Sequence, residues 1–327
     1  MVKFGSICVA FLCALNFPTV LSAATLAQPG FTEVEVVNVN DRRGNFGNIT
    51  FDDAGNAYVV GANRRDNGQV YRIEDDGSLT LIGDATSGNQ TATGITFKDG
   101  SLFVTSSHGR LYEMDAVTGQ TTVLTKLKTK DPTDVQIIDG LYGAEFTILV
   151  VAEDGGATWV DGTTGEVQLT TSGLPSMNAI EVGADGTLFA LSDESPSGLF
   201  SFDENGLIET VVEAPGGVSF ENLAIHQGTG EIFASTSAGE IYVFDPLTLN
   251  ATLFASDLAQ GGALSFSADG TQLYFGEQEG RGGYTISYFD GFDQYELSAV
   301  PLPATLPLLG AAVGIMAYAR RRKKTKS

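Results

Sequence analysis

One short pattern recurs six times along this 327-residue chain: apolar-x-apolar, a turn that carries glycine, and a second apolar stretch. Neighbouring copies begin 40 to 46 residues apart, which is the length of one four-stranded blade of a β-propeller. A β-sandwich does not need such regular spacing, so the repeat favours a propeller. The apolar residues that open the six copies are Ile49, Ile95, Val135, Ile180, Leu223 and Leu264.

The second copy, Thr93 to Leu124, shows the pattern most clearly. It holds four short runs in which apolar and polar residues alternate, as they do in half-buried strands. The pairs Asp99-Gly100 and Thr118-Gly119 tolerate the positive φ of tight hairpins. The third copy, 135–170, is the least regular and depends mainly on its position. The fold class expected is therefore all-β, a six-bladed propeller.

A separate alternating strand, Phe31 to Val39, precedes the first copy. A propeller is commonly closed by a strand from one end of the chain that completes the blade formed at the other end, which removes an open sheet edge. We therefore expect the propeller to occupy residues 28–299, with 31–39 as the strand that closes the last blade.

The charge balance limits the choice of partners. The formal net charge is −22, and seven of the 18 basic residues lie in the two ends, so the part between them carries about −29. Such a surface repels phosphate backbones and argues against nucleic-acid binding. Cations or neutral glycans suit it better, although acidic residues also simply keep exported proteins soluble. The cysteines Cys8 and Cys13 lie near the N-terminus, so the propeller has no disulfide.

Residues 1–27 have the features of a secretory signal peptide. Lys3 precedes an apolar stretch from Ile7 to Leu15, and small residues follow. Cleavage is expected after Ala24 or after Ala27. A buried N-terminal helix is the alternative.

The composition changes again at residues 300–327. An 18-residue apolar run, Leu302 to Ala319, is just long enough to span a membrane. The arginines and lysines that follow it predict a cytoplasmic C-terminus by the positive-inside rule. The sequence thus predicts a single transmembrane helix with the propeller outside the inner membrane.

This tail resembles a known sorting signal. Its beginning, Val300-Pro301-Leu302-Pro303-Ala304, looks like the VPLPA-type C-terminal signal of Gram-negative bacteria, which is related to the PEP-CTERM signals handled by exosortase-like membrane proteases. The resemblance implies anchoring in the inner membrane, processing of the tail by such a protease, and delivery to the cell surface or the exopolysaccharide matrix. An ordinary single-span anchor is the alternative.

Familiar catalytic motifs are absent: the chain has no G-x-S-x-G, H-E-x-x-H, P-loop or D-x-D-x-D-G sequence. Its two histidines do not predict a shared site. His108 falls between a second and a third strand, whereas His226 ends a first strand, so we expect them at opposite ends of the channel. The repeated Asp-Gly and Asn-Gly pairs are expected to be hairpin turns.

The best candidate site lies where the first strands begin, because these positions surround one end of the channel. Carboxylate and amide oxygens there would be suitable ligands for Ca²⁺. The arrangement resembles that of six-bladed lactonases of the gluconolactonase and regucalcin type, which implies a central metal that polarises a carbonyl or activates water. Ordinary turn residues are the alternative. The candidate metal ligands are Asn48, Asp134, Asn178, Glu221 and Asn222.

From these features we expect an exported binding or interaction module without enzymatic activity, associated with exopolysaccharide or the cell envelope. Its expected partners are an exosortase-like protease, a polysaccharide or a surface protein, and the membrane through the C-terminal segment. The alternative is a Ca²⁺-dependent lactonase or esterase that uses the mouth of the channel. A purely structural matrix component is a third possibility.

Overall fold

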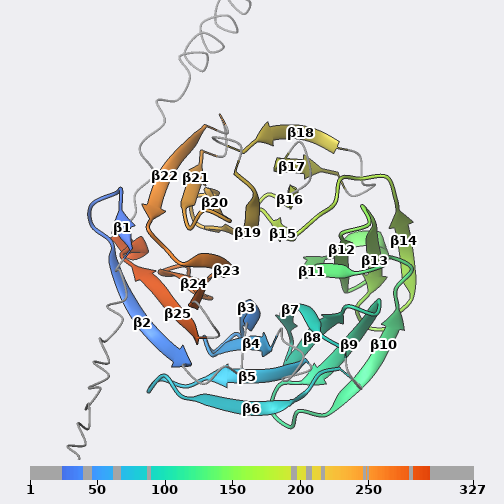
Figure 1. Cartoon of the computed structure of the whole chain (residues 1–327). Helices are drawn as coiled ribbons and strands as arrows, with labels where there is room; N and C mark the ends of the chain where they lie inside the picture. The colour runs from blue at the N-terminus through green and yellow to red at the C-terminus, as the bar shows by residue number, and fades with distance from the viewer. Residues whose placement is uncertain are drawn as a thin grey trace, which may run out of the picture.

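The computed structural model describes residues 24–39, 46–61, 68–86, 90–192, 197–203, 208–214, 218–245, 248, 250–279 and 283–294. Their regular structure is β-strand, apart from short 3-10 turns at Leu141–Gly143 and Phe292–Gln294. The strands form six sheets around a central axis (Figure 1). The predicted all-β, six-bladed propeller is therefore confirmed.

In the first four blades the strands follow chain order from the axis to the rim (Figure 1). Blade one contains β3 (Phe46–Phe51), β4 (Ala57–Gly61), β5 (Gln69–Ile73) and β6 (Leu79–Asp84). Blade two contains β7 (Ala92–Lys98), β8 (Ser101–Ser106), β9 (Arg110–Asp115) and β10 (Thr121–Lys126). Blade three contains β11 (Pro132–Asp139), β12 (Phe146–Ala152), β13 (Ala157–Asp161) and β14 (Val167–Thr171). Blade four contains β15 (Ala179–Val182), β16 (Leu188–Ser192), β17 (Gly198–Phe202) and β18 (Ile208–Glu213).

The last two blades take their outermost strands from the N-terminal part of the chain. Blade five contains β19 (Phe220–Ile225), β20 (Ile232–Thr236), β21 (Ile241–Phe244), β22 (Ala251–Ser256) and the two-residue β1 (Thr25–Leu26). Blade six contains β23 (Gln260–Phe266), β24 (Gln272–Glu279), β25 (Gly283–Asp290) and β2 (Thr32–Val39).

Strand β2 closes the ring. It pairs antiparallel with β25 from Thr32 opposite Asp290 to Val39 opposite Tyr284. Its partner would otherwise be an open edge, which invites pairing with other chains. The strand expected at 31–39 thus stands as the fourth strand of blade six. Strand β1 falls within the segment expected to be a signal peptide, directly after Ala24.

The core is divided among the six junctions between blades. Each junction holds one cluster of buried apolar side chains, which includes the residue that opens a copy of the sequence repeat. For example, Ile95 and Leu102 of blade two pack with Val60 and Val70 of blade one. Burying one such side chain stabilises the fold by roughly 1.5–3 kcal/mol. The repeat therefore encodes both the blades and the contacts that join them.

At the rim, a glycine contact joins each of blades one, two and three to the blade before it. Gly77, Gly119 and Gly165 lie in turns between third and fourth strands and have positive φ. A Cβ atom on these glycines would lie 2.1, 2.1 and 2.5 Å from a carbonyl oxygen of the preceding blade, those of Val36, Ile82 and Leu124 respectively. Each of those three residues is the extra residue of a bulge in an outermost strand. Glycine is required there both by its φ and by the close approach.

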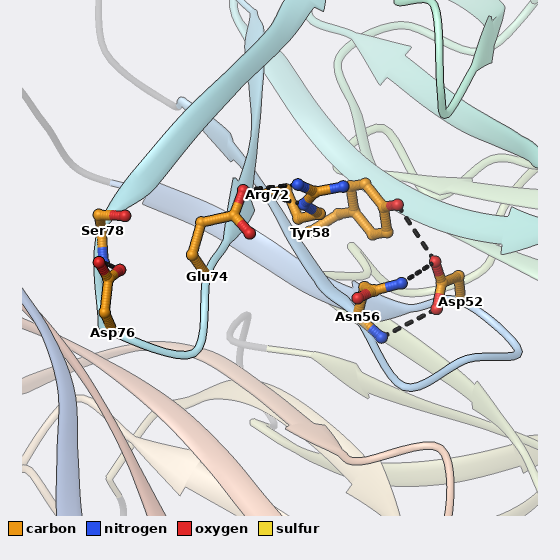
Figure 2. A network of polar contacts seen from close by, with 7 residues as sticks. All are labelled: Asp52, Asn56, Tyr58, Arg72, Glu74, Asp76 and Ser78. Carbon is orange, nitrogen blue, oxygen red and sulfur yellow. Dashed lines mark hydrogen bonds and ion pairs between the residues drawn. The ribbon is translucent and has the colours of Figure 1, made fainter.

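Side-chain hydrogen bonds hold the turns of blade one (Figure 2). Asp52 accepts bonds from the backbone N–H of Asn56 at 2.8 Å and from its side-chain amide at 2.7 Å. The hydroxyl of Tyr58 donates to the same carboxylate at 3.1 Å. Further along, Arg72 forms an ion pair with Glu74 at 2.7 Å. The carboxylates at this end of blade one therefore stabilise its turns.

The repeated Asp-Gly pairs have the same role. Asp76, for example, accepts a bond from the backbone N–H of Ser78 at 2.9 Å (Figure 2). The glycines that follow the aspartates have φ between +73° and +85°, as hairpin turns need. The pair Asn205-Gly206 lies outside the described residues. The pairs confirmed as hairpin turns are Asp76-Gly77, Asp99-Gly100, Asp185-Gly186 and Asp269-Gly270.

Candidate binding site at one end of the channel

A cavity of about 540 Å³ opens at one end of the propeller, among the beginnings of the innermost strands. Blades two to five all contribute to it. Its lining comes from segments that lead into first strands and from turns between second and third strands, which lie at the same end of each blade. The lining residues are Thr91, Ala92, Thr93, Ser107, Asp131, Pro132, Thr133, Glu153, Asn178 and Glu221.

The lining mixes polar and apolar surface. It includes four hydroxyls, one amide and the carboxylates of Asp131, Glu153 and Glu221, whereas Ala92 and Pro132 are its apolar members. No aromatic residue is among them. Such a surface offers donors and acceptors to hydroxyl or amine groups, beside apolar contacts.

Beside the cavity, three of the predicted site residues form one hydrogen-bonded chain. The side-chain amide of Asn222 donates to the side-chain oxygen of Asn48 at 3.1 Å. The side-chain amide of Asn48 in turn donates to the carboxylate of Asp134. The three residues belong to β19, β3 and β11, which are first strands of alternate blades. The structure thus brings together residues that lie far apart in the sequence.

Local backbone irregularity places these side chains. The pairing of β3, β11 and β19 with their neighbours is shifted near the beginning of each strand. One oxygen of Asp134 accepts the N–H of Val135 at 2.8 Å, and the oxygen of Asn222 accepts the N–H of Leu223 at 2.8 Å. The other oxygen of Asp134 accepts the N–H of Ile180, in blade four, at 3.0 Å. The side chains of Asp134 and Asn222 therefore satisfy backbone groups near the shift, and all three side chains link blades.

The other two predicted residues, Asn178 and Glu221, line the cavity itself. Asn178 directly precedes β15, the first strand of blade four, and Glu221 lies within β19, the first strand of blade five. The five residues therefore divide into a hydrogen-bonded chain of three, of which Asp134 is buried, and a cavity pair.

Burial changes the acidity of two carboxyl groups near this site. It raises the pKa of Asp134 to about 7, although three hydrogen bonds partly oppose the shift. It also raises the pKa of Glu181 to about 8, and the charge of Asp134 adds to the effect. A hydrogen bond from Gln136 works in the opposite direction. Both groups thus bind protons near neutral pH.

Sequence reasoning did not single out Glu181 or Gln136. A signal was present, since each directly follows the apolar residue that opens a copy of the repeat, namely Ile180 and Val135. A polar residue at that place in a first strand is expected near the axis. Which charged residue of another blade it approaches depends on how the ring of blades closes.

Calcium binding by Asn48, Asp134 and Asn222 would compete with the hydrogen bonds that their side chains already form. The oxygens of Asn48 and Asn222 and both oxygens of Asp134 already accept hydrogen bonds. A calcium ion there would have to replace the bonds to the two asparagine oxygens. Within the described ranges, no group of three or more His, Cys, Asp or Glu side chains could hold a metal ion. Calcium binding by the five residues stays a prediction.

The two histidines lie at opposite ends of the blades, as their positions in the repeat predict. His108 is exposed in the turn between β8 and β9, close to Ser107 of the cavity lining. His226 follows β19, where its ring is bonded to the carbonyl of Gly270 at 3.1 Å and to the hydroxyl of Thr229 at 2.8 Å. Burial lowers the pKa of His226. It is a structural residue.

The predicted signal peptide and sorting tail lie almost wholly outside the described residues, which run from 24 to 294 with gaps. In the part of the chain that the structure covers, no helix has the length and apolar character to cross a membrane.

Comparison with known protein families places this chain. No curated protein matches the chain. A family model, PQQ_2, described as outer membrane protein assembly factor BamB, matches residues 66–285, which is two thirds of the chain and runs from blade one into blade six. Since the match covers well over half of the sequence and the fold is a propeller, this chain belongs to the family described as outer membrane protein assembly factor BamB.

Proposed function

We propose that this chain is an exported propeller of the BamB family, sorted to the cell surface or matrix, and that it acts as a non-enzymatic binding module. The observation that carries the proposal is the cavity of about 540 Å³, lined by hydroxyls, an amide and carboxylates, that four blades build at one end of the channel. The family description names an assembly factor of outer membrane proteins, which supports a place in the envelope of a Gram-negative bacterium.

The first part of the proposal concerns export and sorting. The signal peptide directs the chain out of the cytoplasm, and cleavage after Ala24 leaves β1 intact, whereas cleavage after Ala27 would remove it. An exosortase-like protease then processes the tail near Val300 to Ala304. N-terminal sequencing and intact-mass measurement of the envelope protein test both steps. A mature protein that retains residues 1–27 or the full tail would contradict them.

The tail also allows a matched test in cells. Replacing Pro301 and Pro303 by alanine should leave the chain unprocessed in the inner membrane, because the motif is what the protease is proposed to read. Disruption of the protease should have the same effect on the unaltered chain. If the double variant reaches the surface at the normal level, the segment is not a sorting signal.

The second part concerns binding. The full chain, purified in detergent, would be titrated with neutral and charged oligosaccharides and with basic peptides. Thr91→Val and Asn178→Ala each remove a hydrogen-bonding group from the cavity, and we expect affinity to fall by about 2- to 10-fold. Glu166→Gln, an exposed change in the turn between β13 and β14 at the other end of blade three, is the control. A saturable ligand that neither cavity variant affects would overturn the proposal.

The Ca²⁺-dependent hydrolase is the second candidate, because Asn48, Asp134 and Asn222 converge from alternate blades. Its test is a calcium titration with lactones and aryl esters. Metal-dependent turnover that disappears in both Asn178→Ala and Asn222→Ala would overturn the binding-module proposal. A protein with no saturable ligand at all would instead be a structural component of the matrix.

A further inference from the structure

The positive charges of the described residues are concentrated in one place. These residues include six lysines and arginines. Two of them form ion pairs near the other end of the blades, Arg72 with Glu74 and Lys98 with Asp139. The other four lie at the cavity end, where Arg110 begins β9, Lys126 ends β10, and Lys128 and Lys130 lie in the connection to β11.

The lysines form an ordered row. Lys126, Lys128 and Lys130 are exposed, whereas Leu127 and Thr129 between them are buried. Lys126 ends β10, and Lys128 and Lys130 follow where the chain bends toward β11. Lys126 also lies opposite Arg110 in the register of β9 and β10. The row therefore presents three exposed positive charges, two positions apart in the sequence.

The backbone of this row is held in place. The N–H of Leu127 donates to the carbonyl of Gly109 at 2.8 Å. The N–H of Lys130 donates to the carboxylate of Asp154 at 2.9 Å. A ligand would thus meet a row whose main-chain path is already fixed, so less conformational entropy is lost on binding.

The row leads directly into the cavity. Lys130 precedes Asp131 and Pro132, which line the cavity, and the exposed His108 follows Ser107 of the lining. The hydroxyls and the amide of the lining can bond to the hydroxyls of sugars. Its carboxylates accept bonds from sugar hydroxyls as well. One surface thus combines positive charges with hydroxyl-binding groups.

We propose that the lysine row and the adjoining cavity bind a linear acidic polysaccharide, with its carboxylates on Lys126, Lys128 and Lys130 and its hydroxyls in the cavity. This inference rests on the proposed function, in which the cavity end is the ligand-binding surface. A carboxylated polysaccharide is preferred to DNA because every unit of it carries hydroxyls for the cavity, whereas the sugars within a DNA strand carry none.

The test measures binding of the full chain in detergent to polygalacturonate and to the same polymer after its carboxylates have been reduced to alcohols. We expect binding to the charged polymer that weakens with added salt, and weak binding to the reduced one. K126Q/K128Q/K130Q should weaken the charged interaction by roughly tenfold or more, at about threefold for each lysine. The arginine counterpart K126R/K128R/K130R should retain it, and Lys98→Gln at the other end is the control.

Three results would overturn the inference: equal binding of the charged and reduced polymers, no effect of the glutamine triple variant, or tighter binding of single-stranded DNA, polyglutamate or phosphatidylglycerol vesicles. Unchanged thermal unfolding of the triple variant shows that its fold is intact. Failure of this inference is distinguishable from failure of the proposed function. Binding that does not depend on the lysines but is weakened by Asn178→Ala would contradict this inference and still support the binding module. An unprocessed tail would contradict the proposed sorting and would not affect this inference.

Discussion

The side-chain amide of Asn222, on β19, donates a hydrogen bond to the side-chain oxygen of Asn48, on β3, at 3.1 Å, although 174 positions separate the two residues in sequence. Asn48 continues this contact to Asp134 on β11. Three alternate blades are therefore joined by side chains near the axis, in addition to the apolar clusters between neighbouring blades. Substitution of Asp134 and the dependence of stability on pH test this link, and a glycine substitution tests the contacts at the rim.

Removing the carboxylate of Asp134 should destabilise the propeller. It accepts bonds from the backbone N–H groups of Val135 and Ile180 as well as from Asn48. Asp134→Ala leaves buried donors without partners, and we expect the free energy of unfolding to fall by about 2–4 kcal/mol. Urea denaturation measures the change. Asp75→Ala, at an exposed turn, is the control and should cost no more than about 0.5 kcal/mol; equal effects of the two would contradict this role.

Stability should rise as the pH falls from about 8 to about 5. Burial raises the pKa of Asp134 to about 7 and that of Glu181 to about 8, from ordinary values of 3.8 and 4.5. The folded state therefore binds more protons than the unfolded state in this range, so protonation favours folding. The slope can reach about 1.4 kcal/mol per pH unit for each proton. Thermal unfolding across this range measures it.

The same experiment has an internal control. Glu181→Gln removes one titrating group, so its stability should change less with pH over this range than that of the unaltered chain. Below about pH 4 the trend should reverse in both proteins, because Asp76, Asp115, Asp185 and Asp269 have lowered pKa values and lose their stabilising hydrogen bonds on protonation. Parallel curves for the two proteins between about pH 6 and 8 would refute the assignment to Glu181.

Gly119 should tolerate alanine much less well than Gly100 does. Both have positive φ, at 69° and 85°, so alanine at either position costs about 1–2 kcal/mol in backbone strain. At Gly119 the new Cβ would also lie 2.1 Å from the carbonyl oxygen of Ile82, whereas nothing lies within 4 Å of that at Gly100. Gly119→Ala should therefore cost at least about 1 kcal/mol more. Chemical denaturation measures the free energy of unfolding of both variants, and equal losses would show that the rim contact can relax.

Removing β2 should open the ring. A chain that starts its propeller at residue 40 leaves the edge of β25 unpaired and uncovers the cluster that includes Val37, so we expect aggregation or failure to fold. A chain that starts at residue 31 loses only β1, which pairs with β22 at two residues, and should remain folded and monodisperse. Size-exclusion chromatography compares the two. A soluble, monomeric product of the longer truncation would show that β2 is dispensable for closure.

Much of the fold can be read from the sequence because a blade is a local structure. Its apolar alternation and its turn glycines lie within about 45 residues, so Ile95 and Asp99-Gly100 reveal strand and hairpin without knowledge of the rest of the chain. The same holds for the role of Phe31 to Val39, since an unpaired alternating strand at one end needs an edge to join. The separation of His108 from His226 also follows from their places in the repeat.

The details of the site depend on contacts between blades. The sequence by itself determined that Asn48, Asp134 and Asn222 would stand near the beginnings of first strands, because that depends on local spacing alone. Only the tertiary structure decided that these three bond to one another while Asn178 and Glu221 line a cavity, because ring closure and the shifted strand pairing set which side chains meet. It also decided that Glu181 lies close enough to Asp134 to feel its charge, since electrostatic interaction depends on distance in space and on burial, and the chain leaves 46 residues between them.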